Sequence, residues 1–332
     1  MRLRIATFNL ENLGRDTGSA ETGEKHLECL RGQILEIGAD ILCLQEIDAQ
    51  KPQKKGKRRL AALDALVRDS PYADFTRIAS ETEAGLPADI HNLVILSRFP
   101  VLEHGQYRQS LMPAPCYRAV TPVPPEAAFE PVQWDRPILH AVADIGGRRL
   151  HIVNLHLRAP LAAPIRGQKS GSVHWRGTAA WAEGFFLATV KRTGQALEAR
   201  LLADRIFDAE AEALIAVAGD FNCESHETPI RVLRASAEDT GNPALECREL
   251  RPAEASVPVE ERYSMRYHGK KFLLDHLLVS PALAAMCQGA AIGNRGLDDE
   301  YEARQEGRTP AGSFHAPVTA DFVIPPAGLP VL

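Results

Sequence analysis

Several apolar runs of this sequence end in residues that can bind a cation or transfer a proton. A buried strand fixes its own backbone, so the polar side chain that ends it projects from the edge of a sheet in a defined direction. Carboxylates, amides and imidazoles in such places bind divalent cations and act as acids and bases. The residues that end or follow these runs are Asn9, Glu46, Asn154, His156, Asp220, Asn222, Asp275 and His315.

Two pairs among these residues are spaced by two positions. Asn154 and His156 lie in one apolar run, and Asp220 and Asn222 close another in the sequence Gly-Asp-Phe-Asn. In an extended strand this spacing places both side chains of a pair on one face. Taken singly, each residue also has an ordinary structural explanation, such as a solvated glutamate, a hydrogen-bonded core histidine or a tight turn. The ordered set is therefore more informative than any single member.

The surrounding pattern predicts strands interleaved with a few helices. Gly38 and Ser70-Pro71 end two helical patterns, and Gly146-Gly147 separates the strands of a hairpin. We expect strands over 2–9, 41–44, 92–96, 138–145, 149–157, 214–218, 272–280 and 314–323, and helices over 26–37, between 60 and 70, and up to about 209.

One segment interrupts this pattern. Seven prolines fall within Pro113–Pro137, which predicts an irregular loop that either shapes specificity or is a surface loop pinned by its aromatic residues. No repeat period or low-complexity linker accompanies it, and the strands on its two sides have the same character. We therefore expect residues 1–332 to form a single domain.

Composition excludes several classes of protein. The chain has 332 residues, of which 45% are hydrophobic and 24% charged, as in folded globular proteins. A net charge of −5 argues against a protein that coats DNA through bulk electrostatics, although a local basic groove is compatible with it. The six cysteines are scattered, which indicates a reducing compartment. Because neither a run of 18 apolar residues nor a signal segment is visible, we expect a cytoplasmic protein without stable membrane insertion.

The order of the motifs resembles that of the endonuclease/exonuclease/phosphatase superfamily, the deoxyribonuclease I-like phosphodiesterases and phosphomonoesterases. The resemblance implies a four-layered α/β sandwich, with two mainly antiparallel sheets face to face and helices outside. This agrees with the strand-rich pattern. The resemblance extends from Ile5 to Phe322 and rests, in order, on Thr7-Phe8-Asn9, Leu44-Gln45-Glu46, Asn154-Leu155-His156-Leu157, Gly219-Asp220-Phe221-Asn222, Leu274-Asp275-His276 and His315-Ala316-Pro317-Val318.

The resemblance also implies roles in phosphoester hydrolysis, which needs an activated water, neutralised phosphoryl charge and a stabilised leaving oxygen. Glu46 would bind a divalent cation, and Asn9 would ligate the same ion or support Glu46. Oxygen ligands of this kind favour Mg²⁺ or Mn²⁺. Asp220 would orient or deprotonate the attacking water, and Asn222 would contact a phosphoryl oxygen or hold that water.

The remaining motifs imply groups that act on the phosphoryl oxygens. His315 would donate a proton or a hydrogen bond to them, and Asp275 would favour the protonated form of His315. His156 would stabilise the transition state, and its neighbours Asn154 and Arg158 would contact the substrate.

One position departs from the family pattern. The family commonly has Asp directly before the last histidine, whereas this chain has Phe314. Phenylalanine cannot ligate a cation, so the expected consequences are weaker metal binding, a single ion or a different substrate, and an inactive binding module is a further alternative. Nearby carboxylates that could replace the missing one are Asp298, Asp299 and Asp321.

The substrate class stays open between a phosphodiester of nucleic acid and a phosphomonoester, such as an inositol phosphate, a lipid phosphate or a nucleotide. His156 favours branches that resemble deoxyribonuclease I, sphingomyelinases, inositol-polyphosphate phosphatases and tyrosyl-DNA phosphodiesterases over abasic-site endonucleases. Basic residues at 51–59, and those from Arg158 to Arg176 with Trp175 among them, either meet a phosphate-rich partner or form solvated loops. The oligomeric state is not predicted.

Overall fold

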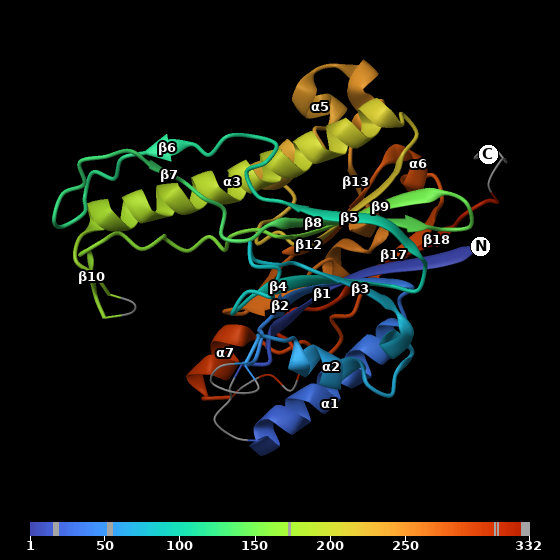
Figure 1. Cartoon of the computed structure of the whole chain (residues 1–332), viewed down its shortest axis with the longest axis horizontal. Coiled ribbons are helices and arrows are strands. Elements are labelled where there is room, and N and C mark those ends of the chain that lie inside the picture. The colour runs from blue at the N-terminus through green and yellow to red at the C-terminus, as the bar shows by residue number, and fades with distance from the viewer. Residues whose placement is uncertain (16–19, 52–55, 172–173, 309, 311, 327–332) are drawn as a thin grey trace.

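Two six-stranded sheets form the centre of the molecule (Figure 1). The computed structural model describes residues 1–15, 20–51, 56–171, 174–308, 310 and 312–326. The first sheet has the order β17 (Cys287–Ile292), β18 (Val318–Val323), β1 (Arg2–Leu13), β2 (Ile41–Ile47), β4 (Asn92–Ser97) and β3 (Thr76–Ala79). The second has the order β13 (Arg251–Pro252), β16 (Asp275–Val279), β12 (Leu214–Asp220), β9 (Arg149–His156), β8 (Ile138–Asp144) and β5 (Val101–Tyr107).

Neighbouring strands are antiparallel except at the centre of each sheet. There β1 runs parallel to β2, and β9 runs parallel to β12. Three two-stranded ribbons stand outside the sheets: β6 (Cys116–Tyr117) with β7 (Glu130–Pro131), β10 (Lys169–Ser170) with β11 (His174–Trp175), and β14 (Met265–Tyr267) with β15 (Lys270–Phe272).

Helices cover the outer faces of the sheets. Helices α1 (Ala20–Ile37) and α2 (Ala61–Val67) pack on the first sheet, and α3 (Thr178–Ala209) packs on the second (Figure 1). The layers predicted by the resemblance, with two face-to-face sheets between helices, are thus confirmed. The shorter helices are α4 (Thr228–Arg234), α5 (Ala237–Thr240), α6 (Pro281–Ala284), α7 (Glu300–Gln305), and the 3₁₀ turns η1 (Pro71–Asp74), η2 (Pro243–Arg248), η3 (Ala253–Ser256) and η4 (Val259–Glu261). None of the helices described is long and apolar enough to cross a membrane.

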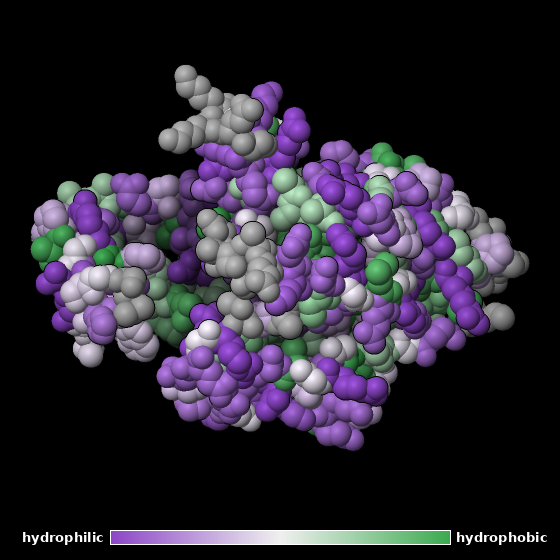
Figure 2. Space-filling view, turned by 90° about the horizontal axis from the view of Figure 1, so that it is seen from below, coloured by the Kyte–Doolittle hydropathy of each residue, from purple (hydrophilic) through white to green (hydrophobic). Residues whose placement is uncertain are grey.

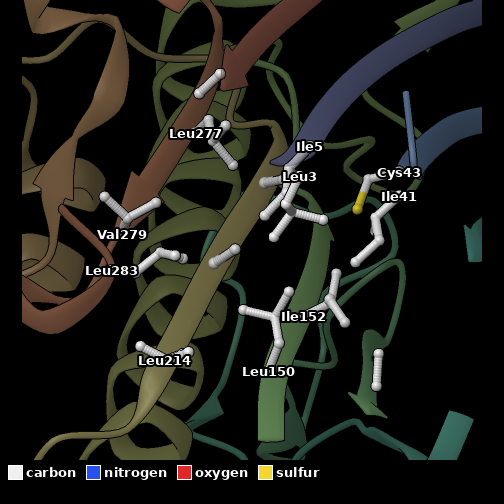
Figure 3. Close-up of a cluster of buried hydrophobic side chains, with 14 of the residues drawn as sticks. Leu3, Ile5, Ile41, Cys43, Leu150, Ile152, Leu214, Leu277, Val279 and Leu283 are labelled. Carbon is white, nitrogen blue, oxygen red and sulfur yellow. The ribbon is translucent and has the colours of Figure 1, made fainter. Parts of the chain in front are cut away.

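Period-two alternation along the strands separates the layers. Leu3 and Ile5 of β1 point between the sheets and meet Leu150 and Ile152 of β9 in one buried cluster (Figure 3). Phe8 of β1 points the other way and packs in the cluster beneath α1 and α2. Burying alternate faces in this way fixes the register, because a slip by one residue would turn the apolar side chains to the wrong layer.

The register brings the polar ends of several strands to one place. Strand β1 pairs Asn9 with Gln45 of β2, and β12 pairs Asp220 both with His156 of β9 and with Asp275 of β16. Strands that lie far apart in the sequence therefore end side by side in the structure.

A buried amide chain joins the two sheets just below these ends. Gln45 Nε2 of the first sheet donates to Asn154 Oδ1 of the second at 2.7 Å, and Thr7 also bonds to Gln45. Asn154 Nδ2 donates to the carbonyl oxygens of Leu44 and Val94 at 3.0 Å each. Satisfied buried hydrogen bonds of this kind fix the position of one sheet against the other.

Helix α3 extends beyond the sheets that it covers. Its 32 residues span about 48 Å, and its N-terminal half projects from the body beside β6, β7 and β10 (Figure 1). Seen from below, this projecting part stands apart from the body across a hollow, and hydrophobic residues lie on its surface (Figure 2). Exposed aromatic side chains there include Trp181 and Phe186, at 48% and 50% exposure.

Two buried carboxylates on α3 hold the proline-rich segment. Glu183 accepts hydrogen bonds from Tyr117 and from Thr121, and Glu198 accepts one from the indole of Trp134 at 2.8 Å. Glu198 also accepts the backbone N–H groups of residues 109 to 111. The segment Pro113–Pro137 is irregular, as predicted, except for the two-residue strands β6 and β7, and charge-assisted hydrogen bonds fix it to α3.

Candidate active site

The residues predicted from the last two motifs lie together. His315 Nδ1 is 2.8 Å from Asp275 Oδ2, and ligand atoms of Asp220, Asp275 and His315 all lie within 4.8 Å of one another. Asp275 and Asp220 are buried, at 0% and 1% exposure. Strand pairing between β12 and β16 places both carboxylates, and the segment that precedes β18 brings His315 to them.

The Gly-Asp-Phe-Asn motif folds in a way that other residues would not allow. Gly219 has φ +150°, and a Cβ there would lie 2.0 Å from the carbonyl oxygen of Leu155. Asn222 takes a left-handed φ of 51°, a conformation that Asn tolerates better than most residues. The turn buries Phe221 in the core beneath α3, while Asp220 and Asn222 meet at the site.

Two amides hold the carboxylate of Asp220. Asn9 Nδ2 and Asn222 Nδ2 each donate to Asp220 Oδ2 at 3.0 Å, and the N–H of Asn222 donates to Oδ1 at 2.8 Å. Burial nevertheless raises the pKa of Asp220 to about 7, a shift that His315 opposes and that Asp275 and Glu46 increase. A carboxyl with such a pKa takes up and releases a proton near neutral pH.

His315 and His156 differ in their state of protonation. Burial alone would lower the pKa of His315, but Asp275 and Asp220 outweigh it and raise that pKa well above its ordinary value. His156 is also buried, and burial together with the positive charge of Arg136 lowers its pKa well below the ordinary value. The site therefore presents a protonated His315 and a neutral His156.

His156 lies close to the carboxylates of both Asp220 and Glu46. His156 Nε2 is 3.4 Å from Asp220 Oδ2 and 3.5 Å from Glu46 Oε1. Glu46 takes a left-handed φ of 57°, and its side chain is 16% exposed, so its carboxylate reaches solvent. A non-glycine residue held in this conformation is costly unless the surroundings fix it, and such residues cluster at functional sites.

Glu11 joins the site, although the sequence analysis did not include it. Glu11 and Asn12 take left-handed φ values of 47° and 62°, and the resulting bend lets the Glu11 carboxylate accept the N–H of Phe314 at 2.8 Å. Burial raises the pKa of Glu11 to about 7, which Phe314 and His315 oppose and Glu300 and Glu46 increase. The signal in the sequence was its spacing of two from Asn9.

Glu11 accounts for the missing aspartate better than the three carboxylates considered from the sequence. Asp299 accepts backbone N–H groups at the start of α7 and at the β14–β15 turn. Asp321 pairs with Arg4, and Asp298 lies 3.7 Å from Arg308. These three side chains are engaged elsewhere, whereas Glu11 contacts the backbone of the residue that replaced the aspartate.

His91 and Arg136 complete the site, and no motif indicated either of them. The ring of His91 stacks on that of His156, with centroids 5.8 Å apart and 14° between the planes. Its Nε2 lies 3.0 Å from Asn12 Oδ1, and its Nδ1 bonds to the guanidinium of Arg136. Burial lowers the pKa of Arg136, an effect that the charges of Glu46, Asp135 and Asp220 oppose.

One nitrogen of Arg136 and one of His156 are available in the described part of the chain. Arg136 Nε and His156 Nδ1 are buried and have no hydrogen-bond partner there. Because a buried polar atom without a hydrogen-bond partner is costly, such atoms are expected where a ligand supplies the missing partner. Both atoms belong to side chains that border the acidic cluster.

The two residues predicted to contact substrate beside His156 lie in different surroundings. Asn154 is fully buried, and its amide is used by Gln45, Leu44 and Val94, so the predicted substrate contact does not fit its position. Arg158 pairs with Asp135, and its side chain is 20% exposed. Asn154 thus joins the sheets, and Arg158 lies where solvent reaches it.

The two basic segments of the sequence are described only in part. Trp175 is half-buried on the projecting part, with Lys169 Nζ 4.9 Å from its ring centroid. The basic run from Lys51 to Arg59 lies partly outside the described residues, which omit 52–55.

The donor set near Glu46 suits a divalent cation. The charge of Glu46 is one of the causes that raise the pKa of Glu11, and a cation bound near both carboxylates would offset that repulsion. The ligand atoms of Glu46, His91 and His156 also lie within 4.8 Å of one another. Asn9, predicted as a ligand or a support of Glu46, instead donates to Asp220 and accepts the N–H of Glu11 at 2.9 Å.

Comparison with known proteins places the fold. In the structure of truncated TDP2 from Caenorhabditis elegans, 98% of the chain aligns with 97% of this one, with 15% identity and a TM-score of 0.56. In the structure of the mannosyl-6-phosphatase of Bacteroides thetaiotaomicron, 100% of the chain aligns with 97% of this one, with 15% identity and a TM-score of 0.57. In the structure of the 3′ phosphatase NExo from Neisseria, bound to a product DNA hairpin, 100% of the chain aligns with 97% of this one, with 17% identity and a TM-score of 0.53.

A family model gives the stronger assignment. No curated protein sequence matches this chain. The model of the endonuclease/exonuclease/phosphatase family matches residues 6–293, which include all the strand ends described above except His315. The enzymes of this family are hydrolases of phosphoesters that generally use divalent metal ions. This chain therefore belongs to the endonuclease/exonuclease/phosphatase family and is a phosphoester hydrolase.

Proposed function

We propose that the protein is a phosphodiesterase that hydrolyses nucleic acid with the help of Mg²⁺ or Mn²⁺. The observation that carries the proposal is the contact of a protonated His315 with Asp275, beside an Asp220 whose pKa is about 7. This arrangement supplies both a base for water and a donor for a phosphoryl oxygen in one buried cluster.

Asp220 is the proposed base. Its pKa of about 7 matches the working pH of a general base, and the amides of Asn9 and Asn222 hold its carboxylate in one orientation. We propose that Asp220 orients the attacking water and takes its proton. Asn222, which also donates to the carbonyl oxygen of Leu157 at 3.0 Å, positions Asp220 in this scheme.

His315, His156 and Arg136 are the proposed phosphoryl contacts. His315 donates a hydrogen bond to an oxygen that gains negative charge, and Asp275 keeps it protonated. The free Nε of Arg136 adds a fixed positive charge, since a guanidinium stays protonated. Neutral His156, whose Nε2 lies 3.4 Å from Asp220 Oδ2, contributes a further hydrogen bond.

Glu46 and Glu11 are the proposed holders of the cation. A bound divalent ion would neutralise charge on the phosphoryl group and the leaving oxygen. The half-buried carboxylate of Glu11 then takes the place of the aspartate that Phe314 replaces.

Groups from both sheets meet at the site. Glu11 and Glu46 belong to strands of the first sheet, and Asp220 and Asp275 belong to strands of the second. Because these groups come from both sheets, we further propose that residues 1–332 act as one domain.

A phosphomonoesterase is the second candidate. A pocket of about 330 Å³ lies between the proline-rich segment and α3, but its lining contains none of the residues of the candidate active site. The fold shared with a mannosyl-6-phosphatase is compatible with this alternative.

A metal-dependent activity screen tests both candidates. The protein is assayed with Mg²⁺, Mn²⁺ or EDTA on bis-p-nitrophenyl phosphate, DNA and RNA, and on sugar, inositol and nucleoside monophosphates. We expect turnover of diesters. Both EDTA and the Asp220→Asn substitution should abolish it, whereas the exposed control variant Asp208→Asn should retain it. Faster turnover of monoesters would select the alternative, and no turnover of any ester by folded protein would refute both.

A further inference from the structure

Three aromatic side chains, two from the β14–β15 hairpin and one from α7, form a cluster beside the site. The rings of His268 and Tyr301 stack, with centroids 4.0 Å apart and planes within 9°. Tyr267 lies alongside this pair, 6.4 Å from His268 and 5.7 Å from Tyr301, and is tilted by about 70° to both. Since Tyr267 is nearly equidistant from the two stacked rings, it packs against their edges and leaves its other side free.

The cluster is exposed rather than part of a core. Tyr267 is 42% exposed, His268 is exposed, and Tyr301 is half-buried. Exposed large aromatic residues that are already ordered against one another lose little conformational freedom when a further ring stacks on them.

A buried carboxylate fixes the cluster in place. Asp299, at 4% exposure, accepts the N–H groups of His268 and Gly269 at 3.0 and 2.8 Å, and that of Tyr301 at 3.1 Å. One side chain thus joins the tip of the β14–β15 hairpin to the first turn of α7. This is a support for a defined surface rather than a chance contact of surface rings.

The hairpin begins at the proposed active site. Met265 forms a β-bridge with His315, and the N–H of Ala316 donates to Ser264 O at 2.7 Å. Tyr267 follows Met265 by two residues, which is about 7 Å along a strand and on the same face. The exposed Lys270 follows the turn and adds positive charge near the cluster.

We propose that Tyr267, supported by His268 and Tyr301, is the surface on which a nucleobase stacks next to the phosphate that is hydrolysed. This inference rests on the proposed function and names the chemical group that the site recognises. Stacking on an aromatic side chain accepts any base, because every base offers a flat π-face, so the platform predicts binding with little sequence preference.

Binding by a variant that does not turn over substrate tests the platform directly. A fluorescent single-stranded oligonucleotide and an abasic strand of the same length and charge are titrated against Asp220→Asn protein with Mg²⁺, with and without Tyr267→Ala. We expect the base-bearing strand to bind about 5- to 150-fold more tightly than the abasic strand, and Tyr267→Ala to remove that difference without changing affinity for the abasic strand.

Three further variants make the result specific. Tyr267→Phe keeps the ring and is expected to keep the difference, whereas Tyr267→Leu keeps apolar bulk without a flat ring and is expected to lose it. Trp181→Ala removes an exposed aromatic residue on the projecting half of α3 and is the matched control that should bind both strands normally. Competition by a nucleoside monophosphate separates a free nucleotide from a strand as the source of the base.

The outcomes separate this inference from the proposed function. Equal binding of the two strands by Asp220→Asn protein, or equal weakening of both by the Tyr267 variants, would overturn the platform even if the wild-type enzyme cleaves diesters. A base preference that depends on Tyr267, in a protein that cleaves no ester, would support the platform and refute the hydrolysis scheme.

Discussion

Asp275→Asn is the substitution that most directly probes the scheme. Asp275 Oδ2 lies 2.8 Å from His315 Nδ1, and both groups are buried, so the carboxylate charge strongly favours the protonated imidazole. An opposite charge at such a distance typically shifts a pKa by about 1 to 3 units, which is about 1.4 to 4 kcal/mol. An asparagine amide would also present a donor to Nδ1 and favour the wrong tautomer.

The expected result follows from the sign of that shift. Because Asp275 raises the pKa of His315, its loss moves the deprotonation of His315 to lower pH. At pH 8 we expect kcat/KM on bis-p-nitrophenyl phosphate to fall about 10- to 1000-fold, and the loss to shrink as the pH is lowered. The alkaline limb of the pH profile should move to lower pH.

Profiles of kcat/KM from pH 5 to 9, together with Tm, give the measurement. The backbone at Asp275 is held by bonds that do not involve its carboxylate, because the N–H groups of Leu274 and Asp275 both donate to Ser264 Oγ at 3.0 Å. The variant is therefore expected to fold. A uniform loss at every pH, with the alkaline limb in its original place, would refute the assignment of Asp275 as the residue that keeps His315 protonated.

Three other substitutions test the fold around the site. Gly219→Ala places a Cβ 2.0 Å from Leu155 O and should cost about 3 kcal/mol or more, so a Tm equal to that of the wild type would contradict the packing described. Glu198→Ala leaves three N–H groups and an indole unpaired, and limited proteolysis should then cut between residues 109 and 134, a region that stays protected in the wild type. Burial first, and then neighbouring positive charge, lowers the pKa of both His140 and His151 to about 4, so these neutral histidines stabilise the fold above about pH 6.5 and lose that contribution as the pH falls towards 4. Urea titrations at pH 7.5 and pH 5 give the difference in free energy of unfolding between the two pH values. In the His151→Gln variant this difference should be smaller than in the wild type by on the order of 2 kcal/mol, and an unchanged difference would contradict the role of His151.

The sequence predicted those parts of the fold that depend on local pattern. Alternation around Leu3 and Ile5, and the hairpin at Gly146-Gly147, gave strands close to those observed, because burial of one face enforces a period of two. Strand β1 nevertheless runs to Leu13, beyond the predicted end at residue 9, since its last residues continue through a bend at Glu11 and Asn12.

Site residues at motif positions that end strands could be predicted from the sequence. Residues that are positioned by long-range tertiary contacts could not. Asp220, Asp275 and His315 meet because strand register brings them together. Arg136 comes from a loop whose path depends on Glu198 of a distant helix, and no spacing in the sequence encodes that contact. Asn154 illustrates the opposite case, in which a residue at a motif position is used entirely by the partner sheet.

The amide chain through Thr7, Gln45 and Asn154 has a consequence for how the enzyme can fail. Asn9 and Glu46 belong to one sheet, while Asp220 and His156 belong to the other, so the reactive groups straddle the seam that this chain closes. Separation of the sheets by even a small displacement would scatter the reactive groups while each sheet kept its own ladder of backbone bonds. Catalytic competence in this molecule is thus a property of the joint between its halves, and it would vanish before secondary structure on gentle denaturation.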